Sequence, residues 1–285
     1  MRRWLEVVET GFFATVQDLG RPGRASLGVG TSGAADRDAL RLGNRVLGNA
    51  EGMAGIEATL GGLVLRFHGG AFAAVTGAPA PISVDDRAEA PYSVFHVPDG
   101  AVVRLGAPPT GLRSYLTVRG GIDVEPVLGS RSTDTLAGLG PGTLKPGAVL
   151  PIGRSEGRIM VDALPVAPPP GGEVELRVLP GPRDDWFSEA AMRTLLSEPY
   201  EVTSEIDRVG MRLTGPVLER VRTGELASEG MVTGALQVPP SGMPVLFLAD
   251  HPLTGGYPVI AVVRSADVGR AAQARPGQLL RFRLR

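Results

Sequence analysis

The sequence contains no cysteine and a single lysine, Lys145, among its 285 residues. Without cysteine the chain can form no disulfide bond and carry out no thiolate chemistry. Its 29 basic and 30 acidic residues give a net charge of −1, so it has no overall field that would attract nucleic acid or an anionic membrane. These properties fit a cytosolic protein, and we expect a cytoplasmic location.

Long hydrophobic runs are also missing. No segment approaches the roughly 20 apolar residues that a membrane helix needs. The N-terminal sequence M-R-R-W-L-E lacks the apolar stretch of about 7–15 residues that is typical of a signal peptide. We therefore expect neither a membrane span nor a secretory leader.

Several motifs for metals and cofactors are absent as well. The histidines, His68, His96 and His251, are widely separated and lack ligand spacing, so we predict no metal site in this chain. No G-x-S-x-G elbow or Walker A sequence occurs, which indicates that any nucleotide is handled elsewhere. Lys145 lies in L-K-P and does not resemble the M-K-M of a biotin-attachment segment.

Glycine and proline, in contrast, are abundant, with 40 and 25 residues and no low-complexity repeat. Short apolar or alternating runs recur between them, for example at 62–67, 173–179 and 258–263. Such a pattern is typical of many short strands joined by tight turns. The sequence therefore predicts a soluble, mostly β protein.

Helical patterns are few. The best one covers 34–47, with Ser32 as candidate N-cap, and weaker ones cover 184–196 and 265–273. The segment V-A-P-P-P-G-G at 166–172 favours an extended linker, so we predict two β-rich domains, 1–166 and 173–285. A long loop within one domain is the alternative.

One strand is predicted to end in a sharp turn with polar side chains at its exit. Apolar residues lead to Gln17 and Asp18, and the chain then turns at L-G-R-P-G, where proline ends the strand ladder and glycine tolerates positive φ. Loops that rigid strands hold in place often carry binding groups. We therefore take Gln17 and Asp18 as candidate site residues.

The segment 28–33, G-V-G-T-S-G, has the spacing of a dinucleotide-binding loop. That fold needs a hydrophobic strand directly before the loop, and the preceding R-P-G-R-A-S-L cannot be one. Two interpretations remain: a carboxylate or phosphate site at the start of the following helix, beside Arg21 and Arg24, or a glycine-rich turn packed on the sheet.

A second candidate loop, 248–258, reads L-A-D-H-P-L-T-G-G-Y-P between two predicted buried strands. Asp250 could act as a base or hydrogen-bond acceptor, and Gly255 and Gly256 would let a ligand approach the backbone. As a sequence feature alone it is equally a hairpin loop in which Asp250 bonds its own backbone.

Arg131 is surrounded by hydroxyl residues in 129–135 and could hold a carboxylate by two hydrogen bonds. The competing interpretation is a loop whose hydroxyls satisfy backbone groups. Arg208 lies in 204–213 among charges and glycines, where salt-bridged structure is the expectation from the residues alone.

The order of short motifs along nearly the whole chain resembles the KipA family, also called allophanate hydrolase subunit 2-like or biotin-dependent carboxyltransferase-like. The motifs are T-V-Q-D-L-G-R-P-G (15–23), S-G-A-A-D (32–36), E-A-T-L-G-G (57–62), V-L-G-S-R-S-T (127–133), D-R-V-G-M-R-L (207–213) and T-G-G-Y-P (254–258). Each is modest alone, but the ordered set is specific.

The resemblance implies a mainly β fold with two cyclophilin-like β-barrel domains and a few short helices. It also implies partners, because relatives work with a KipI-like (allophanate hydrolase subunit 1-like) protein and, in bacterial 5-oxoprolinase, with a LamB/YcsF-like protein. That complex uses ATP to open 5-oxo-L-proline to L-glutamate. We expect this chain to be one component of such an enzyme, inactive alone and not itself the ATP-binding part.

Two other functions remain open. The chain could be the carboxyltransferase component of a biotin-dependent system such as urea carboxylase, with biotin on another protein. It could also be a non-enzymatic antagonist of a KipI-type kinase inhibitor.

If the chain is a component of a 5-oxoprolinase, the motif residues are candidates for catalysis and substrate binding. Asp250 and Asp18 are the candidate catalytic carboxylates. The candidate substrate-binding residues are Arg131, Arg208, Gln17, Thr254, Gly255, Gly256 and Tyr257.

Overall fold

The computed structural model describes residues 3–154, 157–159, 163–222 and 224–284, and these form two compact units. Unit 1 comprises Met1–Arg21, Ser32–Asp134 and Gly138–Pro169. Unit 2 comprises Pro22–Thr31, Thr135–Ala137 and Pro170–Arg285. The domain limits 1–166 and 173–285 stay a prediction, and their end residues 1 and 285 lie outside the described part.

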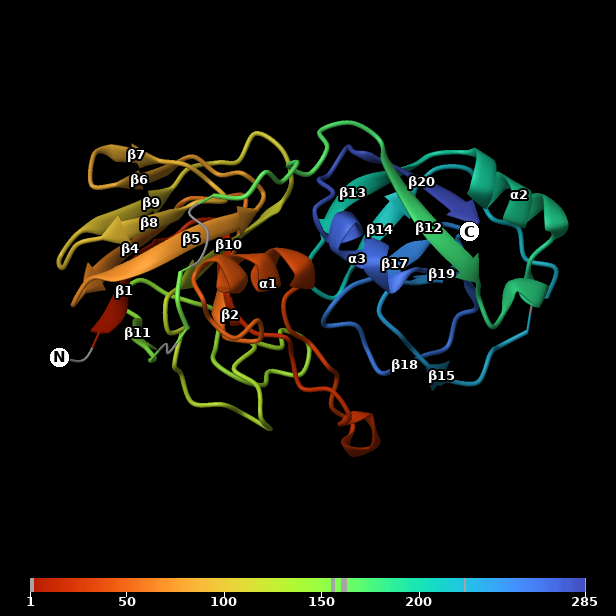
Figure 1. The fold of residues 1–285 in the computed structure, drawn as a ribbon. Helices are drawn as coiled ribbons and strands as arrows, with labels where there is room; N and C mark the ends of the chain where they lie inside the picture. Colours follow the sequence, from red (N-terminus) through yellow and green to blue (C-terminus); the bar gives the residue numbers. More distant parts are fainter. Residues whose placement is uncertain (1–2, 155–156, 160–162, 223, 285) are drawn as a thin grey trace. The chain divides into compact units, whose positions relative to one another are not determined.

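Unit 1 consists mainly of two antiparallel sheets (Figure 1). The first has six strands in the order β11 (Val149–Ile152), β1 (Arg3–Thr10), β4 (Leu63–His68), β9 (Val102–Leu105), β6 (Ile82–Val84) and β7 (Arg87–Glu89). The second has five, in the order β2 (Phe13–Gln17), β3 (Gly55–Thr59), β10 (Arg113–Val118), β5 (Ala71–Gly77) and β8 (Val94–Val97).

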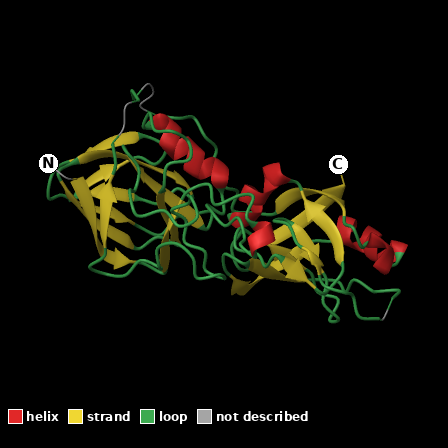
Figure 2. Cartoon of the chain, turned by 90° about the horizontal axis from the view of Figure 1, so that it is seen from below, coloured by secondary structure: helices red, strands yellow, loops and turns green. Residues whose placement is uncertain are grey.

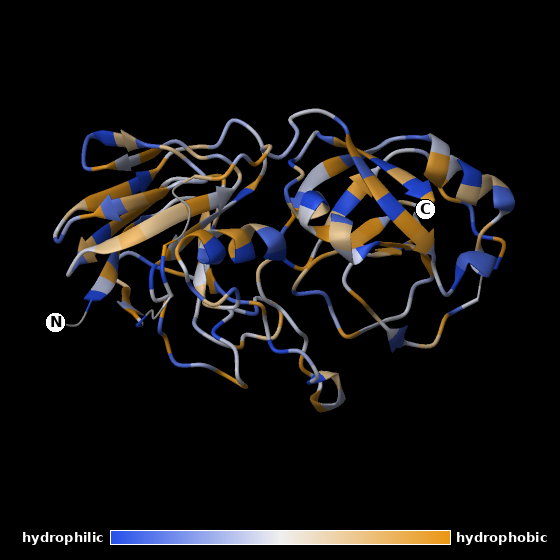
Figure 3. Ribbon diagram, in the orientation of Figure 1, coloured by the Kyte–Doolittle hydropathy of each residue, from blue (hydrophilic) through white to orange (hydrophobic). Residues whose placement is uncertain are grey.

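Both sheets contribute to one hydrophobic core. Leu5 and Val7 of the first sheet and Val16, Ile56 and Val75 of the second are fully buried in the same cluster. Burial of each such side chain stabilises the fold by about 1.5–3 kcal/mol. Figure 3 shows the matching pattern, with hydrophobic residues concentrated on the strands of each unit.

The single α-helix of the described part of unit 1 is α1, Arg37–Val46, which packs on β5 and β10. Its N-cap is Asp36, whose carboxylate accepts a hydrogen bond from the Ala39 N–H at 3.1 Å. The prediction of Ser32 as N-cap is therefore wrong. Ser32 has a left-handed backbone (φ 53°), and its hydroxyl donates to the Thr133 carbonyl at 3.2 Å instead.

A buried polar network holds the chain that leads into α1. The Glu57 carboxylate accepts hydrogen bonds from the Tyr115 hydroxyl at 2.8 Å and from the Ala35 N–H at 2.9 Å. The same hydroxyl accepts a hydrogen bond from the Asp36 N–H at 2.7 Å, and Arg113 lies 3.7 Å from Glu57. Burial and the neighbouring Glu57 raise the pKa of Tyr115 well above its usual value, so this hydroxyl stays protonated and can donate.

Unit 2 is built on a closed barrel of seven strands. Their order is β12 (Val174–Pro180), β19 (Val259–Val263), β16 (Ala235–Gln237), β17 (Val245–Phe247), β14 (Gly210–Thr214), β13 (Tyr200–Ile206) and β20 (Leu279–Leu284). The parallel pairing of β12 with β20, which sets Val174 opposite Leu280, closes the ring. A separate ribbon pairs β15 (Glu229–Gly230) with β18 (Thr254–Gly255).

The helices of unit 2 are short and lie outside the barrel strands, as the view in Figure 2 shows. The predicted helix at 184–196 is two pieces, η2 (Asp184–Trp186) and α2 (Glu189–Ser197). They are separate because Ser188 is extended and caps the second piece by accepting from the Ala191 N–H at 3.0 Å. The predicted C-terminal helix is α3, Ser265–Ala272.

The prediction of a mainly β fold with a few short helices is confirmed. The closed barrel of unit 2 agrees with the expected architecture, and unit 1 places its strands in two sheets around one core. Among the described helices, none is long and apolar enough to span a bilayer.

Tyr115→Phe tests the network before α1. We expect a loss of about 1–3 kcal/mol in the free energy of unfolding, because the Asp36 N–H and the Glu57 carboxylate lose a buried partner. Urea denaturation measures this loss. Tyr257→Phe is the control, since Tyr257 is 45% exposed and should change stability little. Equal effects of the two substitutions would contradict the proposed role of Tyr115.

A pH dependence follows from the ion pair that joins α3 to β12. The Asp267 carboxylate accepts hydrogen bonds from the backbone N–H, Nε and Nη2 of Arg177 at 2.7–2.8 Å, and these bonds lower the pKa of Asp267 below its usual 3.8. The unfolded chain therefore binds this proton at higher pH than the folded one. The stability from the pair is complete above pH 3.8 and is lost as pH falls through the lower, folded-state pKa. Asp267→Asn should give a flatter stability profile in acid, measured by denaturation at several pH values.

Candidate functional site

The structure divides the predicted site residues between the two units. Gln17, Asp18 and Arg131 belong to unit 1, whereas Arg208, Asp250 and 254–257 belong to unit 2.

Asp18 is a buried carboxylate surrounded by hydrogen-bond donors. Oδ1 accepts from the hydroxyls of Ser130 and Ser132, both at 2.6 Å, and from the Gly20 N–H at 2.7 Å. Oδ2 accepts from the Arg131 N–H at 2.6 Å. Asp18 thus fixes the loop that carries Arg131 against the end of β2, and these donors would have to rearrange before it could act as a base.

Gln17 and Arg131 are held in the same region of unit 1. The Gln17 amide nitrogen donates to the Thr15 hydroxyl at 3.0 Å and to the Thr133 carbonyl at 2.9 Å, while its Oε1 is buried without a hydrogen-bond partner among the described residues. The Arg131 guanidinium is half-exposed and donates to Asp123 at 2.6 Å. An exposed pair of this kind is weak, so a ligand carboxylate could displace Asp123.

Arg208 and Asp250 form a buried two-bond ion pair in unit 2. Nε and Nη2 of Arg208 each donate to the Asp250 carboxylate at 2.9 Å. The backbone N–H and hydroxyl of Thr135 also donate to Asp250, at 2.9 and 2.8 Å. Both charged side chains are almost fully buried, so each depends on the other for compensation.

The T-G-G-Y-P segment begins in β18 and is more exposed than the ion pair. A Cβ atom on Gly255 would meet the Gln237 amide nitrogen at 2.5 Å, so any larger residue there would displace the Gln237 side chain. The same Gln237 nitrogen donates to the Tyr257 carbonyl at 3.1 Å and thereby fixes the end of the segment. The Tyr257 side chain remains 45% exposed.

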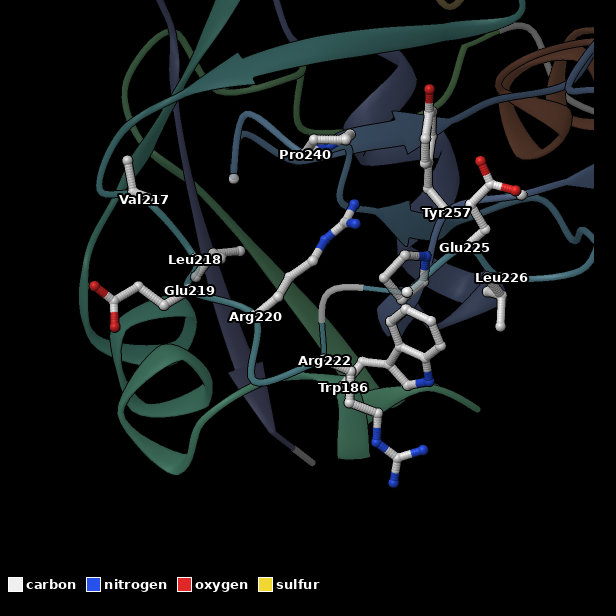
Figure 4. A pocket seen from close by; sticks show the side chains of 14 residues that line it. Trp186, Val217, Leu218, Glu219, Arg220, Arg222, Glu225, Leu226, Pro240 and Tyr257 are labelled. Carbon is white, nitrogen blue, oxygen red and sulfur yellow. The ribbon is translucent and has the colours of Figure 1, made fainter.

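This segment forms one wall of a pocket of about 620 Å³ in unit 2, shown in Figure 4. That volume lies in the range of roughly 300–1,000 Å³ that is usual for small-molecule sites. The lining includes Trp186, Leu218, Arg220, Arg222, Pro240, Gly256 and Tyr257.

Arg220 is one of several members of this pocket that the sequence did not single out. Its guanidinium lies 5.8 Å from the centre of the Tyr257 ring, and Nη2 donates to the Val238 carbonyl. Burial lowers the pKa of Arg220, a shift that Tyr257 opposes more weakly. Its sequence neighbours V-L-E-R-V-R carry no recognisable motif, so only the fold reveals its place beside Tyr257.

The segment 28–33 does not leave the N–H groups at the start of α1 available to an anion. Gly28 ends a short 3₁₀ helix, η1 (Ala25–Leu27), and the N–H groups just before and within the first turn of α1 bond to Glu57, Tyr115 and Asp36. The geometry therefore favours a structural turn over an anion site at this position.

Within the described residues, no group of three or more acidic or histidine side chains could hold a metal ion.

Comparison with known proteins places this geometry in a family. A model of the carboxyltransferase domain, subdomains A and B, matches residues 27–284. The chain is 38% identical to the 5-oxoprolinase C subunit of Escherichia coli, across 98% of this chain and 90% of that protein. It is 32% identical to urea amidolyase of Saccharomyces cerevisiae, across 98% of this chain and 16% of that protein.

A solved structure has the same fold as this chain. The crystal structure of TTHA0988 matches with a TM-score of 0.89 and 36% identity, covering 98% of this chain and 55% of that one. Our chain thus spans about half of TTHA0988 and a small part of the urea amidolyase. The chain belongs to the carboxyltransferase domain family, as its motifs predict.

Asp250→Asn tests whether the ion pair in unit 2 is structural. We expect a loss of about 3–5 kcal/mol in the free energy of unfolding, because Arg208 would keep a buried charge without its partner. Asp185→Asn is the matched control, since Asp185 pairs with Arg222 at the surface and should cost about 0–1 kcal/mol.

The double variant Arg208→Gln/Asp250→Asn should lose less stability than the sum of the two single variants, because no uncompensated charge remains. Strict additivity in denaturant titrations would contradict the coupling.

Proposed function

We propose that this chain is the C subunit of an ATP-dependent 5-oxoprolinase, a hydrolase that opens the cyclic amide 5-oxo-L-proline to L-glutamate. The observation that carries the proposal is the 38% identity to the E. coli protein across nearly all of both chains. The same proposal includes KipI-like and LamB/YcsF-like partner proteins, a cytoplasmic location, and no activity of this chain alone.

Coupling to ATP is chemically reasonable, because ring opening requires water to attack a resonance-stabilised amide. Transfer of the terminal phosphoryl group of ATP to the lactam oxygen would create a leaving group and release ADP. Water then adds at the ring carbon, the C–N bond opens to an acyl phosphate, and a second water releases phosphate and glutamate. No Walker A sequence occurs here, which supports binding of ATP on another member of the complex.

The roles of the motif residues are part of this proposal. Arg131 is the better of the two predicted carboxylate ligands, since its partner Asp123 is exposed and can be displaced. Arg208 would first have to give up its buried pair with Asp250. Asp18 and Asp250 are the carboxylates to test as bases, and in the present geometry both bind donors from neighbouring loops.

Reconstitution tests the function directly. The chain is purified together with its KipI-like and LamB/YcsF-like companions, and glutamate release from 5-oxo-L-proline is measured with and without ATP. We expect ATP-dependent release that disappears when this chain is omitted. Release that persists without it would overturn the proposal.

A second candidate is the carboxyltransferase component of a biotin-dependent enzyme. The carboxyltransferase family model and the 32% identity to urea amidolyase favour it. Carboxyl transfer from carboxybiotin to urea by the assembled proteins, with no glutamate release, would select this function. The third expectation, an antagonist of a KipI-type inhibitor, stays a prediction. Tight partner binding without effect on any turnover would be its signature.

A further inference from the structure

The pocket of unit 2 contains a guanidinium that differs from those of the predicted arginine ligands. Arg131 donates to Asp123 at 2.6 Å and Arg208 to Asp250 at 2.9 Å. Arg222, on the same pocket, lies 2.6 Å from Asp185. Arg220 has no carboxylate within ion-pair distance among the described residues, so it forms no ion pair there.

The remaining contacts of Arg220 leave part of its donor capacity unused. Its one hydrogen bond from the guanidinium goes to the Val238 carbonyl, and Nε is buried without a partner among the described residues. In Figure 4 the side chain extends toward Pro240 and Tyr257, whereas Glu219 points to the opposite side and the Arg222 guanidinium points away. Arg220 is therefore the cation that this pocket offers to a ligand.

The walls around Arg220 combine apolar with charged side chains. Trp186, Leu218, Pro240 and Pro258 line the pocket together with the ring of Tyr257. Aromatic and proline side chains can cover a ligand ring with little loss of conformational freedom. The site thus combines one guanidinium that has no ion-pair partner with aromatic and proline side chains, a combination that fits a small cyclic acid.

The other charges of the pocket limit the charge of its ligand. Glu219 and Glu225 also line it, and Arg222 is already paired with Asp185. One free guanidinium beside two carboxylates favours a monoanion over a polyphosphate, which would be repelled.

We propose that the pocket binds a small cyclic monocarboxylic acid, whose carboxylate accepts hydrogen bonds from the Arg220 guanidinium and whose ring lies against Trp186 and Tyr257. This inference rests on the proposed function, in which 5-oxo-L-proline is such an acid, and it names Arg220, in place of Arg131, as the ligand of the substrate carboxylate. ATP should not occupy this pocket.

Tryptophan fluorescence gives a direct test on the intact chain. The chain has two tryptophans, and Trp4→Phe leaves Trp186 as the single reporter. We expect 5-oxo-L-proline to change the emission in a saturable way. Its neutral analogue 2-pyrrolidone, which has the ring without the carboxylate, should bind at least tenfold more weakly, and ATP should have no effect at millimolar concentration. Calorimetric titration of the unsubstituted chain repeats the measurement without relying on the Trp4 substitution.

Arg220→Gln should weaken binding of 5-oxo-L-proline by about ten- to a hundredfold, which is the range for losing hydrogen bonds to a charged group. Arg220→Lys should restore part of the affinity, because it keeps the charge but not the planar fork. Arg193→Gln, which removes an exposed arginine of α2 outside the pocket, is the matched control and should change affinity less than threefold. Unfolding midpoints of all variants show whether each is folded.

A purely structural Arg220 would give a different result. Arg220→Gln would then lower stability but leave the preference for 5-oxo-L-proline over 2-pyrrolidone unchanged, and that outcome overturns the inference. Absence of any saturable response in both fluorescence and calorimetry also overturns it.

Turnover of the reconstituted complex separates this inference from the proposed function. If the Arg220→Gln complex releases glutamate with the wild-type KM, the function stands and the role of Arg220 is wrong. If the acid binds through Arg220 but the complex releases no glutamate, the pocket stands and the 5-oxoprolinase function is wrong. A raised KM with kcat nearly unchanged supports both.

Discussion

The structure depends on one constraint, which is that a buried carboxylate must be matched by donors from the chain around it. Glu57, Asp18 and Asp250 are each buried, and each binds N–H or O–H groups from a segment distant in the sequence. Because an unmatched charge in a protein interior costs several kcal/mol, each of these carboxylates favours loop arrangements that supply its donors. The need to supply donors to buried carboxylates therefore helps to determine the turns at the strand ends, together with glycine and proline.

This constraint explains how much the sequence could predict. The β content, the short helices and the family follow from local patterns and from motifs that keep their order along the chain. The cap of α1 could not be predicted, because Ser32 and Asp36 are equally good capping residues by type. The choice between them depends on Thr133, which takes up the Ser32 hydroxyl from a distant part of the chain.

The residues that identify the family differ from the residues that remain available to a ligand. In the motifs, Asp18, Glu57, Arg208 and Asp250 are largely occupied in holding the structure together. Arg220 lies outside every recognisable motif, yet its charge is left without an acidic partner within the described residues of the pocket. Its surroundings come from segments separated in sequence, Trp186 and 257–258 among them, and no pattern in a single stretch could bring these together.

The closure of the barrel in unit 2 has a consequence for synthesis on the ribosome. β12 is the first strand of the barrel to emerge and β20 the last, yet these two pair in parallel, Val174 beside Leu280. Until β20 leaves the exit tunnel, β12 presents an open edge that could pair with a strand of another nascent chain. Polar and charged residues alternate along both strands, Glu175 and Arg281 among them. They make this temporary edge less prone to pair with other chains during translation.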